Sequence, residues 1–569
     1  MIKKFEVGGV PGLLAPTTGP MQAGLAFRVG FTDEPLAKRG ITHLIEHLSL
    51  HSVGVADYHY NGATGVEFTR FHMQGAEKDV VAFLNGVCAA LRDLPMRRLA
   101  VEKEVLEAEA HGRSASVSEP MWLWRHGARD YGAGAYPEWG LPSITEDDLR
   151  AWVARYFTRE NAVLWVAGDA VPAGLELDLP SGTRQPLPEP SSALPVTPAC
   201  FGGSPGLVAW DTVVPRSAAS SVFAEVLERM LFRELRQESG LSYAAQTDYQ
   251  PTGRDRVVIT AAADCLPENS GAVLGGMVDV LATLRAGRVD PADVTAVISK
   301  RVEGLRHAEE VAARLPGLAV GLLAGRDVLD VDEQIAGLTA VTPADVAAVA
   351  AGAWANGLIM APSRADWAGF AIAPPESLRA VTGTEFKPLG DVTARLVVGP
   401  EGASLVEPHN LLTVRFDECV LMRAWPDGGR QLIGADGIVV WAEPTLHRGG
   451  REAVKLIDAA VPPERVVVQA IRNPEQIPQP RTRSTTPTTT ASTSDRVSGI
   501  LGLIVFWPLT LIFGALGALL FLSLSTDAED VEYTIVIGLL CIPVTIIGII
   551  GIRRSLYRMR YGPRKSRQR

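Results

Sequence analysis

Two stretches of the chain carry apolar residues at helical spacing, at 80–92 and at 272–285. In each stretch the apolar side chains recur every three or four positions, which places them on one face of an amphipathic helix. Each stretch is followed by a turn and by a second helical pattern. Because the same order of elements occurs twice, the pattern predicts a duplicated module.

Further signals repeat with the same order. Thr145 and Thr342 are candidate N-caps, each with an Asp three residues later, and this spacing is a variant of the helix capping box. Apolar runs at 162–168 and 357–362 predict a buried strand after each of these helices. Helices that alternate with strands in this way indicate a mixed α/β (α+β) fold class.

These repeats place one module at residues 1–185 and a second at 200–370, joined by a Pro-rich linker at 180–198. The pattern then changes. Residues 386–470 contain short β-branched runs broken by Gly, Pro and Asp, followed by a helical pattern at 450–459. We expect a small β-rich domain there, which loosely resembles a pleckstrin-homology-like barrel.

The C-terminal part has the composition of a membrane anchor. Residues 473–496 are rich in Pro, Thr and Ser, which is typical of a flexible or semi-extended linker. Two uncharged apolar stretches follow, at 499–524 and 533–552, each long enough to cross a bilayer core of about 30 Å. We therefore expect residues 499–552 to form a transmembrane helical hairpin, followed by a basic tail at 553–569.

The distribution of charge predicts the topology of this hairpin. The tail carries eight Lys and Arg residues, whereas the loop between the two spans carries only acidic charges. By the positive-inside rule, the tail and the residues before the first span face the cytoplasm, where the tail can also bind anionic lipid headgroups. The five Cys residues are scattered and form no C-x-x-C, and no N-terminal targeting signal is evident, both of which agree with a reducing compartment. The sequence thus predicts an integral protein of the plasma membrane with two spans.

The net charge narrows the choice of partner. The formal charge is -10, and without the eight positive charges of the tail it is about -18 for residues 1–552. A distinctly acidic soluble part argues against nucleic acid as a partner and favours basic peptides.

The strongest chemical signal is the sequence His-Leu-Ile-Glu-His at positions 43–47. Residues i and i+4 of a helix share a face, so the imidazoles of His43 and His47 can converge on one metal ion, with Glu46 beside the open coordination position. Zinc held by neutral imidazoles lowers the pKa of a bound water to about 7, and a carboxylate can take the proton of that water as it attacks a carbonyl. The motif predicts hydrolytic zinc chemistry and requires a third ligand.

An acidic helix at 101–110 offers candidates for that third ligand. Its four glutamates are Glu102, Glu104, Glu107 and Glu109. The spacing of seven residues puts Glu102 and Glu109 on one face, while the other two project elsewhere. Spacing alone does not choose between them, and an acidic helix is more often a solvated face.

Residues 1–370 resemble the insulinase, pitrilysin and mitochondrial processing peptidase family of zinc metallopeptidases, whose motif is H-x-x-E-H. The resemblance rests on the opening strand pattern at 25–35, the motif within 40–47, the segment 61–64, and the helix segment 102–109, which matches the form E-x-x-V-[IL]-x-x-E. It implies two tandem modules that form half of a clamshell peptidase chamber.

The resemblance also implies a ligand set. Glu109 would be the third ligand of one Zn2+ per chain, and Glu102 would support it from the second coordination shell. The interval between His47 and Glu109 is shorter than is usual in the family, which we attribute to a shortened loop at 51–60. His72 and His111 remain alternative third ligands.

Three further residues have expected roles in binding the substrate. Asn61 opens a segment that resembles the family's N-A-x-T edge strand, which binds extended peptides through main-chain pairing. Arg236 and Tyr243 keep the spacing of a pair that, in relatives, reaches the scissile carbonyl, and both are suited to stabilising an oxyanion. Taken without the resemblance, Asn61 would be a turn residue, Arg236 an exposed charge on a helix, and Tyr243 a half-buried strand residue.

In relatives the Arg-Tyr pair comes from the half-chamber that faces the zinc. One chain supplies one half, so we expect a homodimer, or a heterodimer with a related half-chamber, in which each zinc site meets the partner's Arg and Tyr. The sequence thus predicts a membrane-anchored zinc endopeptidase that acts on peptides or unfolded segments. Two alternatives are a catalytically silent binding or assembly protein and a membrane scaffold in which residues 386–470 dock a partner.

Overall fold

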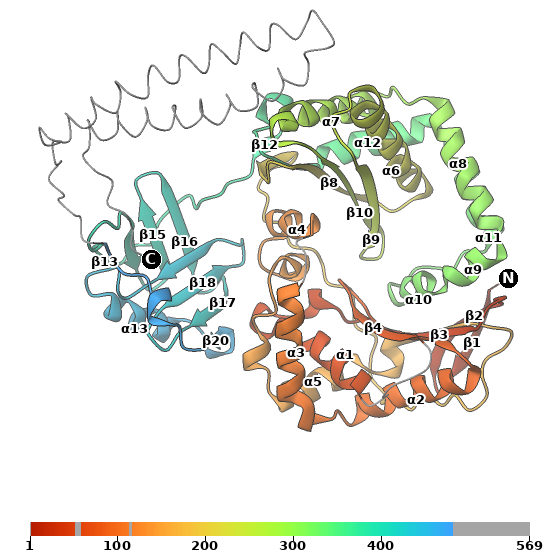
Figure 1. The fold of residues 1–569 in the computed structure, drawn as a ribbon, viewed down its shortest axis with the longest axis horizontal. Coiled ribbons are helices and arrows are strands. Elements are labelled where there is room, and N and C mark those ends of the chain that lie inside the picture. Colours follow the sequence, from red (N-terminus) through yellow and green to blue (C-terminus); the bar gives the residue numbers. More distant parts are fainter. Residues whose placement is uncertain (1, 52–58, 113–115, 482–569) are drawn as a thin grey trace, which may run out of the picture. The chain divides into compact units, whose positions relative to one another are not determined.

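The computed structural model describes residues 2–51, 59–112 and 116–481. The first module is built on a six-stranded sheet with the order β1-β2-β6-β3-β5-β4, in which β2 and β6 are parallel and the other pairs antiparallel. Its strands are β1 (Lys3–Val7), β2 (Val10–Ala15), β3 (Met21–Phe27), β4 (Tyr60–Thr64), β5 (Thr69–Gly75) and β6 (Ala162–Ala167). Its helices are α1 (Ile41–His51), α2 (Glu77–Arg92), α3 (Leu99–Gly112), α4 (Ser118–His126) and α5 (Glu146–Tyr156). Apolar faces of α1, α2 and α5 bury one face of the sheet (Figure 1).

The second module has a similar sheet with the order β12-β7-β11-β8-β10-β9, in which β7 and β11 are parallel like β2 and β6, and β12 also pairs parallel with β7. Its strands are β7 (Ala199–Gly202), β8 (Leu207–Pro215), β9 (Ala245–Thr252), β10 (Arg256–Asp264), β11 (Leu358–Ala361) and β12 (Ala371–Ile372). Its helices are α6 (Ala218–Leu231), α7 (Ser270–Arg285), α8 (Pro291–Arg306), α9 (Ala308–Ala313), α10 (Leu315–Leu323), α11 (Val331–Thr339) and α12 (Pro343–Ala355). β4 and β9 are therefore equivalent edge strands of the two sheets.

One helix of each module packs on the sheet of the other module. Met121 of α4 is buried against residues of β8 and β11, and Arg125 of the same helix forms a buried ion pair with Asp211 of β8. In return, Leu315 and Ala319 of α10 are buried against the outer face of the first sheet. This exchange covers the second face of both sheets and joins the modules through apolar contacts.

The third part of the chain is a β-rich domain, as the short apolar runs predict. One sheet has the order β13-β14-β15-β16 and the other β19-β18-β17-β20. The strands are β13 (Thr384–Phe386), β14 (Arg395–Val398), β15 (Gly402–Glu407), β16 (Asn410–Arg415), β17 (Cys419–Ala424), β18 (Arg430–Gly434), β19 (Val439–Ala442) and β20 (Val466–Val468), and α13 (Gly450–Ala460) packs on their shared core. The strands β13, β15 and β20 lie outside the apolar runs from which the sequence predicts this domain.

The mixed α/β class and both capping boxes are confirmed: Thr145 and Thr342 each accept a hydrogen bond from the Asp amide three residues later. The expected membrane hairpin at 499–552, the basic tail at 553–569 and most of the linker at 473–496 lie outside the described residues. Within the described ranges, no single helix is long and apolar enough to span a membrane. Helices α11 and α12 reach the necessary length and hydropathy only when they are counted together, and they are bent by 86° relative to each other.

Candidate metal site

The helix that carries the His-Leu-Ile-Glu-His motif is fixed at its N-terminus by a buried carboxylate. Glu34 accepts hydrogen bonds from the amides of Gly40 and Thr42, each at 2.9 Å, and from Arg39 Nη1 at 2.7 Å. These bonds satisfy two amides that have no partner within α1, and the negative charge complements the helix dipole. The residues of α1 that face the sheet are apolar and fully buried. The motif therefore stands on a rigid element.

His43 and His47 lie one turn apart on α1, with ring centroids 4.8 Å apart and rings perpendicular. Helix α3 packs against α1 and brings two glutamates to them. Glu109 Oε2 is 3.7 Å from His43 Nε2, and Glu109 Oε1 is 3.5 Å from His47 Nε2. One ligand atom from each of these three residues lies within 4.8 Å of the other two.

The separations suit a metal ion better than direct contacts. At 3.5 and 3.7 Å the Nε2 to carboxylate distances are too long for strong hydrogen bonds. Two ligands at the usual zinc distances and a tetrahedral angle are about 3.4 Å apart. Two neutral imidazoles and one carboxylate also form a common donor set of catalytic zinc sites. The residues present therefore fit a zinc ion.

Both imidazoles are oriented by a carboxylate on their other nitrogen. His43 Nδ1 donates to Glu138 Oε1 at 2.9 Å, and His47 Nδ1 lies 3.4 Å from Glu102 Oε2. Glu102 is buried, and its second oxygen accepts from Arg98 Nη2 at 2.9 Å. A proton held on each Nδ1 leaves the lone pair of each Nε2 directed at the gap beside Glu109, which is the tautomer that a metal ligand requires.

Glu46 lies beside this cluster under a short strand. Its Oε2 accepts a hydrogen bond from Thr64 Oγ1 at 2.7 Å, and a Cβ atom at Gly62 would come within 2.6 Å of its Oε1. Burial raises the pKa of the Glu46 carboxyl above its ordinary value, while His43, His47 and Thr64 oppose that shift. The carboxylate is thus confined and is a stronger base than an exposed glutamate.

The strand above Glu46 is β4, at the edge of the first sheet. Within the part of the chain that the structure describes, β4 pairs with β5, and Asn61 is exposed on it, so Asn61 is a strand residue and not a turn residue. An edge strand can present main-chain donors and acceptors to an extended peptide. The segment at 61–64 is thus part of an edge strand that lies beside Glu46.

Arg236 and Tyr243 are brought together, but in the second module. Arg236 lies on a π-helical segment, Phe232–Glu238, that continues α6, and its guanidinium stacks 5.0 Å from the rings of Tyr243 and Phe232. Tyr243 is 76% exposed, so it is not the half-buried strand residue that its position would otherwise indicate. The pair forms an exposed, stacked unit.

The two alternative histidines take other positions. The ring of His72 on β5 packs edge-on against that of His59, with centroids 6.1 Å apart, and burial together with His59 lowers the pKa of the His72 imidazole. His111 Nδ1 contacts the carbonyl of Glu107 at 2.6 Å. Neither belongs to the group of His43, His47 and Glu109.

Glu138 was missed by the sequence analysis. It is buried, it lies 95 residues from the histidine that it contacts, and it comes from an irregular segment between two short 3-10 helices. No spacing rule connects it to the motif. Thr64 was part of a noted segment, but its bond to Glu46 was not anticipated.

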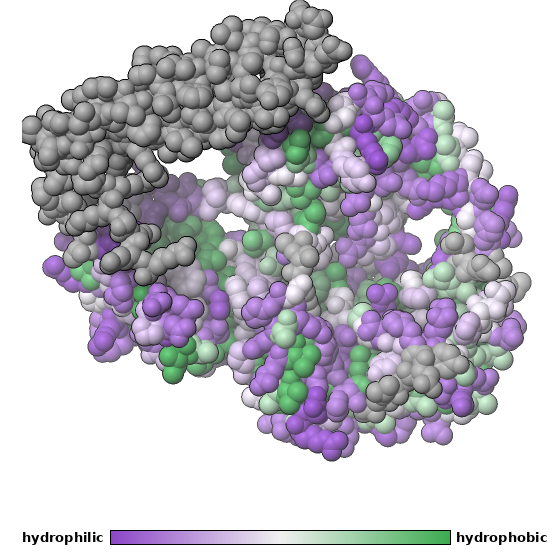
Figure 2. Space-filling view, viewed as in Figure 1, coloured by the Kyte–Doolittle hydropathy of each residue, from purple (hydrophilic) through white to green (hydrophobic). Residues whose placement is uncertain are grey.

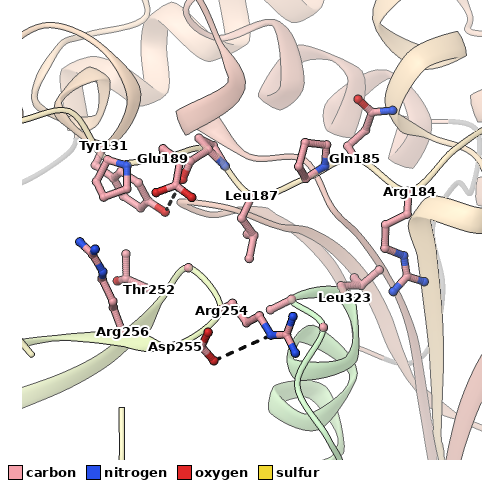
Figure 3. Close-up of a pocket in the computed structure, with 16 residues that line it drawn as sticks. Tyr131, Arg184, Gln185, Leu187, Glu189, Thr252, Arg254, Asp255, Arg256 and Leu323 are labelled. Carbon is pink, nitrogen blue, oxygen red and sulfur yellow. Dashed lines mark hydrogen bonds and ion pairs between the residues drawn. The ribbon is translucent and has the colours of Figure 1, made fainter. Parts of the chain in front are cut away.

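A cavity of about 240 Å³ opens beside the cluster and is lined by His43, Thr64 and Glu138 together with Phe31, Arg39, Ser116, Glu119, Trp122 and Gly134. A second cavity, of about 610 Å³, lies between the linker at 184–190, the turn after β9 and the end of α10 (Figure 3). Arg254 and Asp255 form an ion pair at its wall, 3.8 Å apart. None of the candidate site residues lines this second cavity, which lies where the linker contacts the second module.

The outer side of α3 faces solvent. Val101 and Val105 on this helix are 40% and 38% exposed, and Figure 2 shows apolar colour over its position within a largely polar surface. Glu109 itself has a side chain that is 44% exposed. Glu109 is thus the most exposed member of the cluster, whereas the side chains of His43 and His47 are 11% and 17% exposed.

Residues 205–301 match the family model described as the peptidase M16 inactive domain. This match begins just before β8 and ends within α8, so it lies in the second module and does not reach the residues of the metal cluster. No curated protein matches the chain.

Several solved structures share the fold. A protease from Helicobacter pylori has a TM-score of 0.53 at 17% identity, over 63% of this chain and 98% of its own. The peptidase M16 inactive domain from Pseudomonas fluorescens has a TM-score of 0.53 at 16% identity, over 64% and 98%. The ferredoxin protease FusC, solved with Arabidopsis ferredoxin, has a TM-score of 0.50 at 14% identity, over 73% of this chain and 56% of its own. The fold is that of M16-like peptidases.

Proposed function

We propose that this chain is a zinc-dependent endopeptidase that hydrolyses peptides or unfolded protein segments. The observation that carries the proposal is the convergence of His43, His47 and Glu109, with the carboxylate of Glu46 beside them. Zinc held by the three ligands would act as a Lewis acid and would lower the pKa of a water molecule to about 7.

The surrounding residues have separate tasks in this proposal. Glu46 takes the proton of the attacking water, and Thr64 holds its carboxylate in place. The edge strand β4, with Asn61, aligns the substrate as an added strand. The cavity of about 240 Å³ beside His43 accepts a substrate side chain. A protein-derived substrate is supported by the similar structure of FusC, which was solved with a ferredoxin.

Metal removal tests this proposal. Treatment of the full chain with a zinc chelator is expected to abolish peptide hydrolysis, and one equivalent of zinc per chain is expected to restore it. Bound metal is measured by elemental analysis and hydrolysis with a quenched fluorescent peptide. If the metal-free protein hydrolyses the peptide as fast as the loaded protein, zinc has no role and the proposal is wrong.

A second copy of the chain would complete the site. The chain corresponds to 98% of the Helicobacter protease but only 56% of FusC, as expected of one half of a longer peptidase. We propose a homodimer in which Arg236 and Tyr243 of one chain face the metal cluster of the other and stabilise charge on the scissile carbonyl oxygen.

Complementation tests the dimer. Glu46→Gln and Arg236→Ala are each expected to be inactive alone, because every site then lacks one component. Co-expressed at equal levels, they are expected to recover about a quarter of wild-type hydrolysis, since half of the dimers contain one intact site. Sedimentation of the active protein as a monomer, or no recovery in the mixture, would contradict a shared site.

The C-terminal hairpin at 499–552 remains a proposal from composition. We propose that it anchors the peptidase to the inner face of the plasma membrane. The full chain is then expected in the membrane fraction, released by detergent and not by high salt, and protected from protease added to intact cells. Release by salt alone would favour peripheral attachment.

One observation favours an alternative function. The matched family model is that of an inactive domain, which fits a catalytically silent protein that binds peptides or assembles with a partner. In that case the zinc-loaded chain would bind a peptide without cleaving it, and Glu46→Gln would leave that binding and any cellular phenotype unchanged.

A further inference from the structure

Two short segments of the first module contact the β-rich domain and also support the metal site. The first segment is 34–39, which leads into α1, and the second is 136–139, which ends at Trp139. In each segment some side chains pack on the β-rich domain, and others bond to the start of α1 or to His43. This arrangement connects a domain of unassigned role to the ligand geometry.

In the segment 34–39, the charged ends hold α1. Glu34 accepts the amide hydrogen bonds at the start of the helix, and Arg39 bonds to Glu34 and to the carbonyl of Ala133. Leu36 and Ala37, between them, are buried at 2% and 3% exposure in a cluster that contains Leu421, Ile433 and Val467 of the β-rich domain. Movement of that cluster would therefore act on the residue that caps α1.

In the segment 136–139, Glu138 holds His43 Nδ1 at 2.9 Å. Its neighbours Tyr136 and Trp139 belong to the same cluster as Leu421 and Ile433. The guanidinium of Arg423, on β17, lies 4.3 Å from the Trp139 ring, and Arg423 is itself held by Gln431 and Gln469. Glu138 is thus flanked in the chain by Tyr136 and Trp139, two aromatic residues that contact the β-rich domain.

The junction is tight as well as apolar. The amide of Ala128 donates to the carbonyl of Ala435 at 3.0 Å, and a Cβ atom at Gly127 would come within 2.1 Å of that carbonyl oxygen. On the other side, a Cβ atom at Gly40 would lie 2.9 Å from the Cβ of Glu138. Close packing on both sides leaves the segments little room to move independently of the domain.

We infer that the β-rich domain is a positioning element of the metal site, which holds Glu34 and Glu138 so that α1 and His43 are preorganised for zinc. In its reference to zinc, this inference rests on the proposed function. Outer partners of metal ligands typically change metal affinity by about 10-fold to 100-fold when they are lost. A domain that holds two such groups should have an effect in the same range.

Pairs of neighbouring residues on β17 and β18 provide variants that distinguish loss of the contact with the first module from general destabilisation of the β-rich domain. On β18, Ile433 faces the first module and its neighbour Leu432 faces the domain's own core, and both are fully buried. On β17, Leu421 and Met422 have the same relation. Truncation of either member to Ala removes similar packing from the domain, but only Ile433→Ala and Leu421→Ala open the junction.

Two measurements on the full chain decide the question. Zinc affinity is measured by competition with a chelator, and amide hydrogen exchange at residues 40–47 is measured in metal-free protein. The junction variants Ile433→Ala and Leu421→Ala are expected to bind zinc about tenfold more weakly and to exchange faster at these amides. The core variants Leu432→Ala and Met422→Ala are expected to leave both quantities near wild type.

Equal effects of junction and core variants on both quantities, or no effect of the junction variants, would overturn the inference while leaving the zinc proposal intact. If wild-type protein binds no zinc, the proposed function fails, and the exchange comparison alone then decides whether the domain holds α1.

Discussion

Replacement of Glu46 by Gln is expected to lower the rate of peptide hydrolysis by about 10²-fold to 10⁴-fold while zinc remains bound. The amide has the shape of the carboxylate, and its oxygen can still accept the hydrogen bond from Thr64 Oγ1. It cannot take a proton from water. Because burial raises the pKa of the Glu46 carboxyl, its basicity is closer to what proton transfer near neutral pH requires, so the loss should be large.

The informative measurement is kcat/KM together with zinc content in the same samples. Retained zinc and lost hydrolysis place Glu46 in the proton transfer and not in metal binding. The matched control is Glu104→Gln, which changes an exposed residue of α3. This variant is expected to have the kcat/KM and the zinc content of the wild type. Hydrolysis of Glu46→Gln at the wild-type rate would remove Glu46 from the mechanism.

The parts of this site that could be predicted from the sequence are those set by local periodicity. The spacing of His43 and His47 puts both rings on one face of α1, and the spacing of Glu102 and Glu109 does the same on α3. The capping boxes at Thr145 and Thr342 likewise depend only on neighbours in the chain. Helical geometry converts such spacings into positions without knowledge of the rest of the fold.

The parts that could not be predicted depend on contacts between distant segments. Glu138 reaches His43 from an irregular segment, where no period indicates a direction for the side chain. Leu421 and Met422 are successive apolar residues that are both buried, which shows only that β17 is covered on both faces. Only the tertiary structure shows that the first module covers one of these faces, so the sequence alone predicts a separate segment at 386–470.

Glu109→Ala is expected to lower zinc affinity by at least about 100-fold, and hydrolysis with it, because loss of a ligand should cost no less than loss of an outer partner. Among the described residues, Glu109 is the carboxylate whose oxygens approach the Nε2 atoms of both His43 and His47. Glu102 contacts the opposite nitrogen of His47, so Glu102→Ala should weaken zinc binding less and leave a measurable rate.

Glu107→Ala is the matched control for this prediction. Glu107 is an exposed glutamate on the same helix, two residues earlier, and its loss changes the net charge by the same amount. Chelator competition should therefore rank the three variants with Glu109→Ala weakest, Glu102→Ala intermediate and Glu107→Ala near wild type. Equal zinc affinity in Glu109→Ala and Glu107→Ala would show that Glu109 makes no specific contact with the ion, and the third ligand would then have to be sought among other groups.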